Sequence, residues 1–221
     1  MIRGAIFDMD GVLVDNVRQH TEAWKQLGRE IGLDWSDEEI KRVFGKRNPE
    51  ILQALVPRRL SQEEIVAYGD HKEELYRSIM AADLHPVPGL EKLLGELKGC
   101  AVKTAVATSG PIENTRFVLR GLRLEEYFDA LVTGADAPRS KPDPGIFLVA
   151  AERLGLESSA CVVFEDSPVG LKGARAAGSP AVALATTHQV DELRQYSPDM
   201  IIRDFTELDV TDLLSLRAKP A

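Results

Sequence analysis

Residues 2–11, Ile-Arg-Gly-Ala-Ile-Phe-Asp-Met-Asp-Gly, decide the fold of this chain. The apolar residues of 2–7 show no helical period, so we expect a short buried strand. Gly11 favours a sharp turn at its end. Asp8 and Asp10 then either share one pocket or are separated by the turn into distinct roles. Two buried carboxylates are costly unless a divalent cation or a similar partner compensates them; the alternative is a strand-ending aspartate and a turn aspartate.

Composition limits the class of protein and its partners. The formal net charge of −8 over 221 residues argues against nucleic acid or an anionic membrane as a partner. Cys100 and Cys161 are too few for a disulfide framework, and we expect two buried thiols in a cytoplasmic protein. The chain starts with a strand and has no apolar run near ~20 residues, so we expect no signal peptide and no membrane span. We expect a monomer.

The pattern of apolar residues changes twice along the chain. Residues 16–82 have helical spacing, with Ser-x-x-Glu capping boxes starting at Ser36 and Ser61. Asn48 is expected to cap a helix that begins with Pro49. From Pro88 onward, strands and helices alternate. The expected strands are 102–108, 130–133, 161–165, 181–185 and 200–202, and the expected helices are 90–97, 112–122, 144–154, 168–177 and 208–216.

This alternation predicts an α/β fold, a parallel sheet with helices on both faces. The catalytic core would comprise residues 1–15 and 83–221, and the all-helical block 16–82 would be an inserted cap. Because the insertion follows the first strand, we expect it to close over a site at the carboxyl ends of the strands, where such sheets bind ligands.

Polar residues follow the second and third strands of this core. Thr108, Ser109 and Gly110 offer a hydroxyl and backbone N–H groups that would hold phosphoryl oxygens. The alternative for these residues is simple capping of the next helix. Lys141 follows the third strand in a loop stiffened by Pro142, and its ammonium would bind the same oxygens. The alternative for Lys141 is a solvated charge.

The fourth strand ends in two more carboxylates, Glu165 and Asp166, although Asp166 could also be a capping residue. A separate explanation for each group of polar residues does not account for their occurring together at the ends of four predicted strands. One phosphoryl-transfer site accounts for all four groups. Asp8 would attack phosphorus and form an aspartyl-phosphate, and Asp10 would protonate the leaving oxygen and then help to deprotonate water. Mg²⁺ prefers oxygen ligands, and Asp8, the Asp10 backbone carbonyl and Asp166 would bind it, with Glu165 as a direct or an outer ligand.

The motifs Asp8-x-Asp10-Gly-Val-Leu, Ala-Thr108-Ser-Gly, Lys141-Pro-Asp-Pro and Glu165-Asp166-Ser-x-x-Gly occur in this order and together resemble the haloacid dehalogenase superfamily. The resemblance covers essentially the whole chain and implies a Rossmann-like core, dependence on Mg²⁺ and the roles given above. The helical insertion resembles the cap of the β-phosphoglucomutase-like branch, which includes many phosphatases of small phosphorylated metabolites. Dehalogenases of this family do not carry the second aspartate as acid/base, so Asp10 argues against dehalogenation.

Two residues of the cap resemble substrate-facing residues of the mutase branch. His20 lies on one helical face with Trp24, and it is either a packed histidine or a substrate contact. Lys72 interrupts an apolar helical stripe. It either extends its head into water or points into the cleft toward an anionic group.

Lys46, Arg47 and Asn48 form a third candidate region of the cap. They resemble a substrate-specificity loop, and their cations could recognise a distal anion. The alternative is a solvent-exposed loop.

The sequence therefore predicts a Mg²⁺-dependent phosphatase of a small, sugar-phosphate-like metabolite that works through an aspartyl-phosphate. A sugar phosphomutase is the alternative. Asn16, where the mutase has threonine, and Ser109-Gly110-Pro111 in place of the mutase's Ser-Lys-Asn favour hydrolysis. A phospho-accepting signalling module is a third hypothesis, disfavoured because the acceptor lies on the first strand and a helical insertion follows it.

Overall fold

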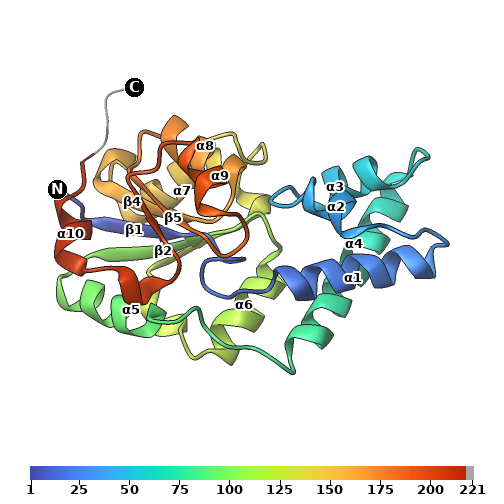
Figure 1. Ribbon diagram of the computed structural model, residues 1–221, viewed down its shortest axis with the longest axis horizontal. Coiled ribbons are helices and arrows are strands. Elements are labelled where there is room, and N and C mark those ends of the chain that lie inside the picture. The colour runs from blue at the N-terminus through green and yellow to red at the C-terminus, as the bar shows by residue number, and fades with distance from the viewer. Residues whose placement is uncertain (218–221) are drawn as a thin grey trace. The chain divides into compact units, whose positions relative to one another are not determined.

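The computed structural model describes residues 1–217 and contains two compact units. The first unit consists of residues 1–15 and 85–221, and its described part ends at residue 217. The second unit consists of residues 16–84. The second segment of the first unit begins at His85. The sequence pattern predicts that this segment begins at residue 83. Figure 1 shows the sheet in the first unit and a group of helices in the second.

Within residues 1–217, six strands form one sheet in the order β3-β2-β1-β4-β5-β6, and every neighbouring pair is parallel. The strands are β1 (Gly4–Phe7), β2 (Lys103–Ala107), β3 (Ala130–Val132), β4 (Cys161–Glu165), β5 (Ala181–Leu184) and β6 (Met200–Ile202). This order is that of a Rossmann-like doubly wound sheet, in which ligands bind at the carboxyl ends of the strands near the point where the order reverses. The predicted fold class is confirmed.

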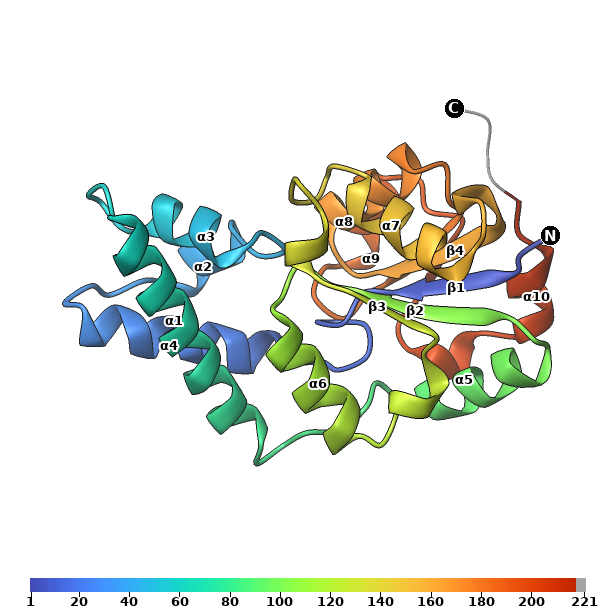
Figure 2. The ribbon, with the colours of Figure 1, turned by 180° about the vertical axis from the view of Figure 1, so that it is seen from behind.

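Helices cover both faces of this sheet. Figures 1 and 2 show α7 and α8 on one face and α5 and α6 on the other. The helices of this unit are α5 (Leu90–Gly99), α6 (Ile112–Gly121), α7 (Gly145–Leu154), α8 (Pro168–Ala176), α9 (Val190–Arg194) and α10 (Val210–Ser215). Short 3-10 turns are η1 (Glu125–Tyr127), η2 (Gly134–Asp136), η3 (Ser158–Ala160) and η4 (Phe205–Glu207). The sequence pattern did not predict α9.

The core differs between the two faces of the sheet. One cluster is rich in alanine and includes Ile6, Phe147 and Val163, all fully buried. Elsewhere in the core, Phe7 stacks on Phe164 of the neighbouring strand, with ring centroids 4.5 Å apart. Burying each such side chain contributes about 1.5–3 kcal/mol, so the apolar run that leads to Asp8 anchors the middle of the sheet.

The second unit consists of α1 (Val17–Glu30), α2 (Asp37–Lys41), α3 (Asn48–Leu55) and α4 (Gln62–Met80). Both predicted capping boxes are present, at Ser36 and at Ser61, where the backbone N–H groups of each serine and of the glutamate three residues later are satisfied. The predicted cap at Asn48 is wrong. Arg47 occupies the N-cap position of α3, and the Asn48 amide donates to Glu73 instead.

One expectation about the cysteines is also wrong. Cys161 is buried in β4, but Cys100 is exposed, because it forms the C-cap of α5 just before the chain turns at Ala101. Among residues 1–217, no helix combines the length and the apolar character needed to cross a bilayer.

Candidate active site

The ends of three adjacent strands bring the predicted site residues together. Phe7 pairs with Val106 of β2 on one side and with Phe164 of β4 on the other. The N–H of Asp8 continues this ladder and donates to the Phe164 carbonyl over 3.0 Å. Residues that follow β1, β2 and β4 therefore lie at the same edge of the sheet.

Lys141 joins this edge from the loop after β3. Its Nζ donates to Asp8 Oδ1 over 2.8 Å and to Glu165 Oε1 over 2.6 Å. The residue is 5% exposed, so the alternative of a solvated charge is wrong. The bond between Lys141 and Pro142 is cis.

Glu165 is fully buried, and protein donors hold both of its carboxylate oxygens. Oε1 accepts from Lys141. Oε2 accepts from the N–H groups of Asp166 and Ser167, at 3.0 and 2.9 Å, and from the Ser167 hydroxyl at 2.9 Å. Gly170 packs so closely against this carboxylate that a Cβ there would overlap it. Hydrogen bonds to both oxygens and the close packing of Gly170 thus fix the position of the Glu165 side chain.

Asp166 does not cap the following helix, as one interpretation of the sequence held. Ser167 is the N-cap of α8, and its hydroxyl accepts from the Gly170 N–H over 3.1 Å. The Asp166 carboxylate is buried, and its Oδ2 accepts from the Thr187 hydroxyl. Thr187, which follows β5 at the same edge of the sheet, was not predicted from the sequence.

Asp8, Glu165 and Asp166 form a compact carboxylate cluster, with one oxygen from each lying within 4.8 Å of the others. Burial raises the pKa of Asp8 to about 7, and the opposing charge of Lys141 does not offset it. Burial and the neighbouring Glu165 also raise the pKa of Asp166. Burial disfavours the charged form of Lys141, but Asp8 and Glu165 outweigh it and raise its pKa.

One ammonium, that of Lys141, contacts two of these three clustered carboxylates, so it compensates their negative charge only in part. This is the electrostatic environment that a hard divalent cation would complete, and the oxygen donors suit such an ion. The residues present therefore fit a metal site.

Asp10 lies just before the turn that follows β1, and its charge contributes to raising the pKa of Asp8. Gly11 adopts φ 76°, which gives the predicted sharp turn after Asp10. Asp10 Oδ2 lies 4.0 Å from the position that a Cβ on Gly110 would take, whereas Asp8 contacts Lys141. Asp10 thus lies beside the loop that follows β2, whereas Asp8 is hydrogen-bonded to Lys141.

The Thr108–Gly110 segment forms a tight loop at the end of β2. Thr108 is buried, and its hydroxyl accepts from the Gly110 N–H over 3.0 Å, while Ser109 is half-buried. The Thr108 hydroxyl therefore accepts from the loop and not from the first turn of α6, whose N-cap position is occupied by Pro111.

In the second unit, three of the predicted cap residues lie in one polar cluster, in which His20 and Lys72 are buried and Asn48 is half-buried. Lys72 is 2% exposed, and its Nζ lies 2.7 Å from His20 Nδ1 and 3.0 Å from Glu73 Oε1. Asn48 donates to the same Glu73 oxygen over 2.8 Å. His20 stacks on Tyr76, with ring centroids 3.8 Å apart. The interpretation in which the Lys72 head lies in water is therefore wrong, and Glu73 is a partner that the sequence pattern did not indicate.

Lys46 and Arg47 precede α3 and differ in exposure. Lys46 is exposed, as the solvent-loop interpretation expects, and Arg47 is half-buried at the N-cap position. The contacts described above thus bring together His20, Asn48 and Lys72 of the predicted cap residues.

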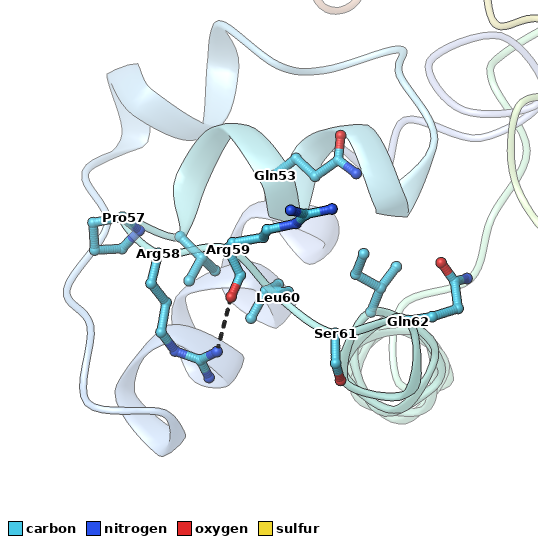
Figure 3. Close-up of a pocket in the computed structure, with 9 residues that line it drawn as sticks. Gln53, Pro57, Arg58, Arg59, Leu60, Ser61 and Gln62 are labelled. Atoms are coloured by element: carbon cyan, nitrogen blue, oxygen red, sulfur yellow. Dashed lines mark hydrogen bonds between the residues drawn. The ribbon is translucent and has the colours of Figure 1, made fainter.

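A separate hollow of about 720 Å³ lies in the second unit, between the end of α3 and the start of α4 (Figure 3). Arg58 is beside it, with its guanidinium donating to Glu64 and to the Arg59 carbonyl. None of the described residues lining this hollow belongs to the predicted site.

Comparisons with known proteins agree with this geometry. The chain is 31% identical to the validoxylamine A 7′-phosphate phosphatase of Streptomyces hygroscopicus subsp. limoneus, over 94% of this chain and 96% of that protein. It is 33% identical to the phosphorylated carbohydrates phosphatase of Thermotoga maritima, over 80% of this chain and 82% of that protein. It is also 27% identical to the β-phosphoglucomutase of Bacillus subtilis, over 94% and 92%.

The crystal structure of a HAD hydrolase, family IA, variant 3, from Entamoeba histolytica superimposes with a TM-score of 0.89 at 29% identity, covering 96% of this chain and 98% of that one. The family model of haloacid dehalogenase-like hydrolases matches residues 2–178, which include the ends of β1, β2, β3 and β4. This chain belongs to the haloacid dehalogenase-like hydrolases.

Proposed function

We propose that this protein is a Mg²⁺-dependent phosphatase that hydrolyses a phosphorylated sugar or a similar small metabolite. The observation that carries the proposal is the position of the Lys141 ammonium, within hydrogen-bonding distance of both Asp8 and Glu165 inside a buried carboxylate cluster. Membership of a hydrolase family and two relatives named as phosphatases support the hydrolytic activity. One of these is named for phosphorylated carbohydrates, and this supports the substrate class.

In this proposal, an oxygen of Asp8 attacks phosphorus and the bond from phosphorus to the leaving oxygen breaks, giving an aspartyl-phosphate. Asp10 donates a proton to the leaving oxygen. It then accepts a proton from the water that attacks phosphorus and releases phosphate and free Asp8. The different neighbours of the two aspartates support this division of roles.

Lys141 and the Thr108–Gly110 loop would hold the phosphoryl oxygens. Lys141 is fixed by Asp8 and Glu165, so its charge is in place before the substrate arrives. The hydroxyls of Thr108 and Ser109 and the backbone N–H groups of Ser109 and Gly110 would donate to the same group, whereas the Thr108 N–H donates to the Val132 carbonyl.

Asp8, Asp166 and the Asp10 backbone carbonyl would bind Mg²⁺, which supplies positive charge next to the transferred phosphoryl group. Glu165 would act mainly from one shell further out, because protein donors already occupy both of its oxygens. Its contribution is then to keep Lys141 charged and in position.

The cap residues His20, Lys46, Arg47, Asn48 and Lys72 would select the substrate through the part remote from its phosphate. The buried cluster of His20, Lys72 and Glu73 supports this role, since it combines donors and acceptors in one place. We also propose that the protein is a cytoplasmic monomer, which its free thiols suit. Light scattering tests the oligomeric state.

A sugar phosphomutase is the second candidate, favoured by the 27% identity to a β-phosphoglucomutase. A signalling module is disfavoured because the chain belongs to a family of hydrolases. The test is a screen of phosphorylated sugars, polyols and other small metabolites with Mg²⁺, measuring phosphate release and isomerisation together. We expect phosphate release to dominate for at least one sugar or polyol phosphate. Isomerisation that outpaces phosphate release in the presence of a sugar bisphosphate would establish the mutase instead.

A further inference from the structure

The segment Thr186-Thr187-His188, here called the β5 loop, directly contacts the carboxylate cluster. The Thr187 hydroxyl donates to Asp166 Oδ2. His188 Nδ1 lies 3.1 Å from the Asp166 backbone carbonyl, so this nitrogen carries the hydrogen and donates. One short loop thus contacts both the side chain and the backbone of Asp166.

The β5 loop also contacts the turn after β1. The Thr186 hydroxyl donates to the Gly11 carbonyl over 2.6 Å. A Cβ on Gly11 would overlap Asp166 Oδ2 and would lie 2.7 Å from Thr187 Oγ1, so these groups are packed tightly together. The loop therefore connects the turn that carries Asp10 to the strand end that carries Asp166.

We infer that Thr187 is a positioning residue for the metal site, whose hydroxyl fixes the orientation of the Asp166 carboxylate toward the bound cation. This inference rests on the proposed Mg²⁺ site. A carboxylate with one oxygen held by a hydroxyl cannot rotate freely about its last bond, so its other lone pairs keep their direction. Hydrogen-bond partners of this kind change metal affinity by about 10- to 100-fold when removed.

A purely structural role for Thr187 makes a different prediction. If the hydroxyl only anchored the loop, its loss would lower the stability of the protein and leave the affinity for the cation unchanged. The test therefore measures Mg²⁺ binding directly, by isothermal titration calorimetry on metal-stripped protein, and not only the activity of the loaded enzyme.

Four variants separate these roles. Thr187→Val removes the hydroxyl at nearly constant shape, and Thr187→Ser restores it. Thr104→Val is the matched control, because Thr104 is buried and its hydroxyl donates to the Tyr127 carbonyl, away from the carboxylate cluster. Thr187→Ala is measured in parallel, so that a failure of the valine variant to fold does not end the test.

We expect the Kd for Mg²⁺ to rise at least about tenfold in Thr187→Val or Thr187→Ala, and by about twofold or less in Thr187→Ser and Thr104→Val. At saturating Mg²⁺, the kcat of Thr187→Val should recover most of the wild-type value. Wild-type affinity in both variants without the hydroxyl, or an equal loss in Thr187→Ser, would overturn the inference while leaving the proposed function intact. Absence of Mg²⁺ binding by the wild-type protein would overturn the proposed function itself.

Discussion

The Lys141 ammonium donates to Glu165 across the carboxyl ends of β1 and β4, over a distance of 2.6 Å. Glu165 in turn accepts from backbone N–H groups at the start of α8 through its other oxygen. The start of α8 thus fixes the Glu165 carboxylate, which in turn fixes the Lys141 ammonium in contact with Asp8. This chain of contacts places the charge that phosphoryl transfer requires before any substrate binds.

The variant Lys141→Ala tests the contribution of the Lys141 ammonium to catalysis and to stability. We expect kcat to fall by about 10²–10³, the usual effect of losing one preorganised donor. We also expect the free energy of unfolding to fall by about 3–5 kcal/mol, because Asp8 and Glu165 remain buried without their cation. Steady-state kinetics and urea unfolding measure the two effects. Lys92→Ala, which changes an exposed lysine, serves as the control and should alter neither quantity. A kcat within a fewfold of wild type would remove Lys141 from the mechanism.

Gly170→Ala tests the rigidity of the Glu165 carboxylate. The new methyl group would overlap this carboxylate, which neighbours hold through both oxygens, so Glu165 must shift and release Lys141. We expect a large loss of phosphate release and a lower melting temperature. Gly95→Ala is the matched control, since no described atom lies within 4 Å of its new Cβ, and should stabilise α5 by about 0.5–1 kcal/mol. Equal activity in both variants would contradict the proposed role of Glu165.

The raised pKa of Asp8 predicts how stability depends on pH without metal. Folding raises this pKa from 3.8 to about 7, so the folded state binds more protons than the unfolded state between these values. The stability from Asp8 is complete below about pH 4 and is lost as the pH rises through about 7, a change on the order of a few kcal/mol. Asp166 acts in the same direction.

Thermal unfolding in EDTA at pH 6 and pH 8 measures this effect. We expect a lower midpoint at pH 8, and we expect Mg²⁺ to restore it by compensating the ionised carboxylates. Asp8→Asn removes the titrating group and should flatten the difference between the two pH values. An unchanged pH dependence in this variant would show that other groups cause it.

The buried pair of Lys72 and Glu73 predicts non-additive effects on the stability of the second unit. Glu73→Gln leaves the Lys72 ammonium buried without its counter-charge and should lower the free energy of unfolding by about 3 kcal/mol or more. Adding Lys72→Met removes that charge and should recover part of the loss. Urea unfolding of the two single variants and the double variant gives the coupling energy. Simple additivity would show that the two side chains do not interact.

Much of the fold follows from local patterns. The strand at residues 161–165 is predicted residue for residue, and the capping boxes at Ser36 and Ser61 start their helices as expected. These signals are strong because each depends on neighbouring residues alone. Asn48 shows where a local pattern fails. Asparagine favours N-cap positions, but the Asn48 amide donates to Glu73, which lies 25 residues further along the chain.

The candidate site could likewise be predicted from the sequence only in part. Asp8, Lys141, Glu165 and Asp166 could be brought together from the sequence because they stand at or after the ends of three strands, β1, β3 and β4, of one parallel sheet. Thr187 was missed because threonine after a strand is common and only its contact with Asp166 distinguishes it. Glu73 was missed because an acidic residue beside Lys72 on a helix looks like surface charge until burial is known.

Covalent capture of the phosphoryl group on Asp8 tests the central claim most directly. Asp10→Asn should still react with p-nitrophenyl phosphate, whose leaving group needs no acid, but should then fail to activate water. The account predicts a burst of about one nitrophenolate per enzyme, and borohydride reduction followed by mass spectrometry should place homoserine at position 8. The double variant Asp8→Asn/Asp10→Asn should give neither signal. Steady phosphate release from Asp8→Asn, or a phosphoryl group trapped on any other residue, would contradict the account.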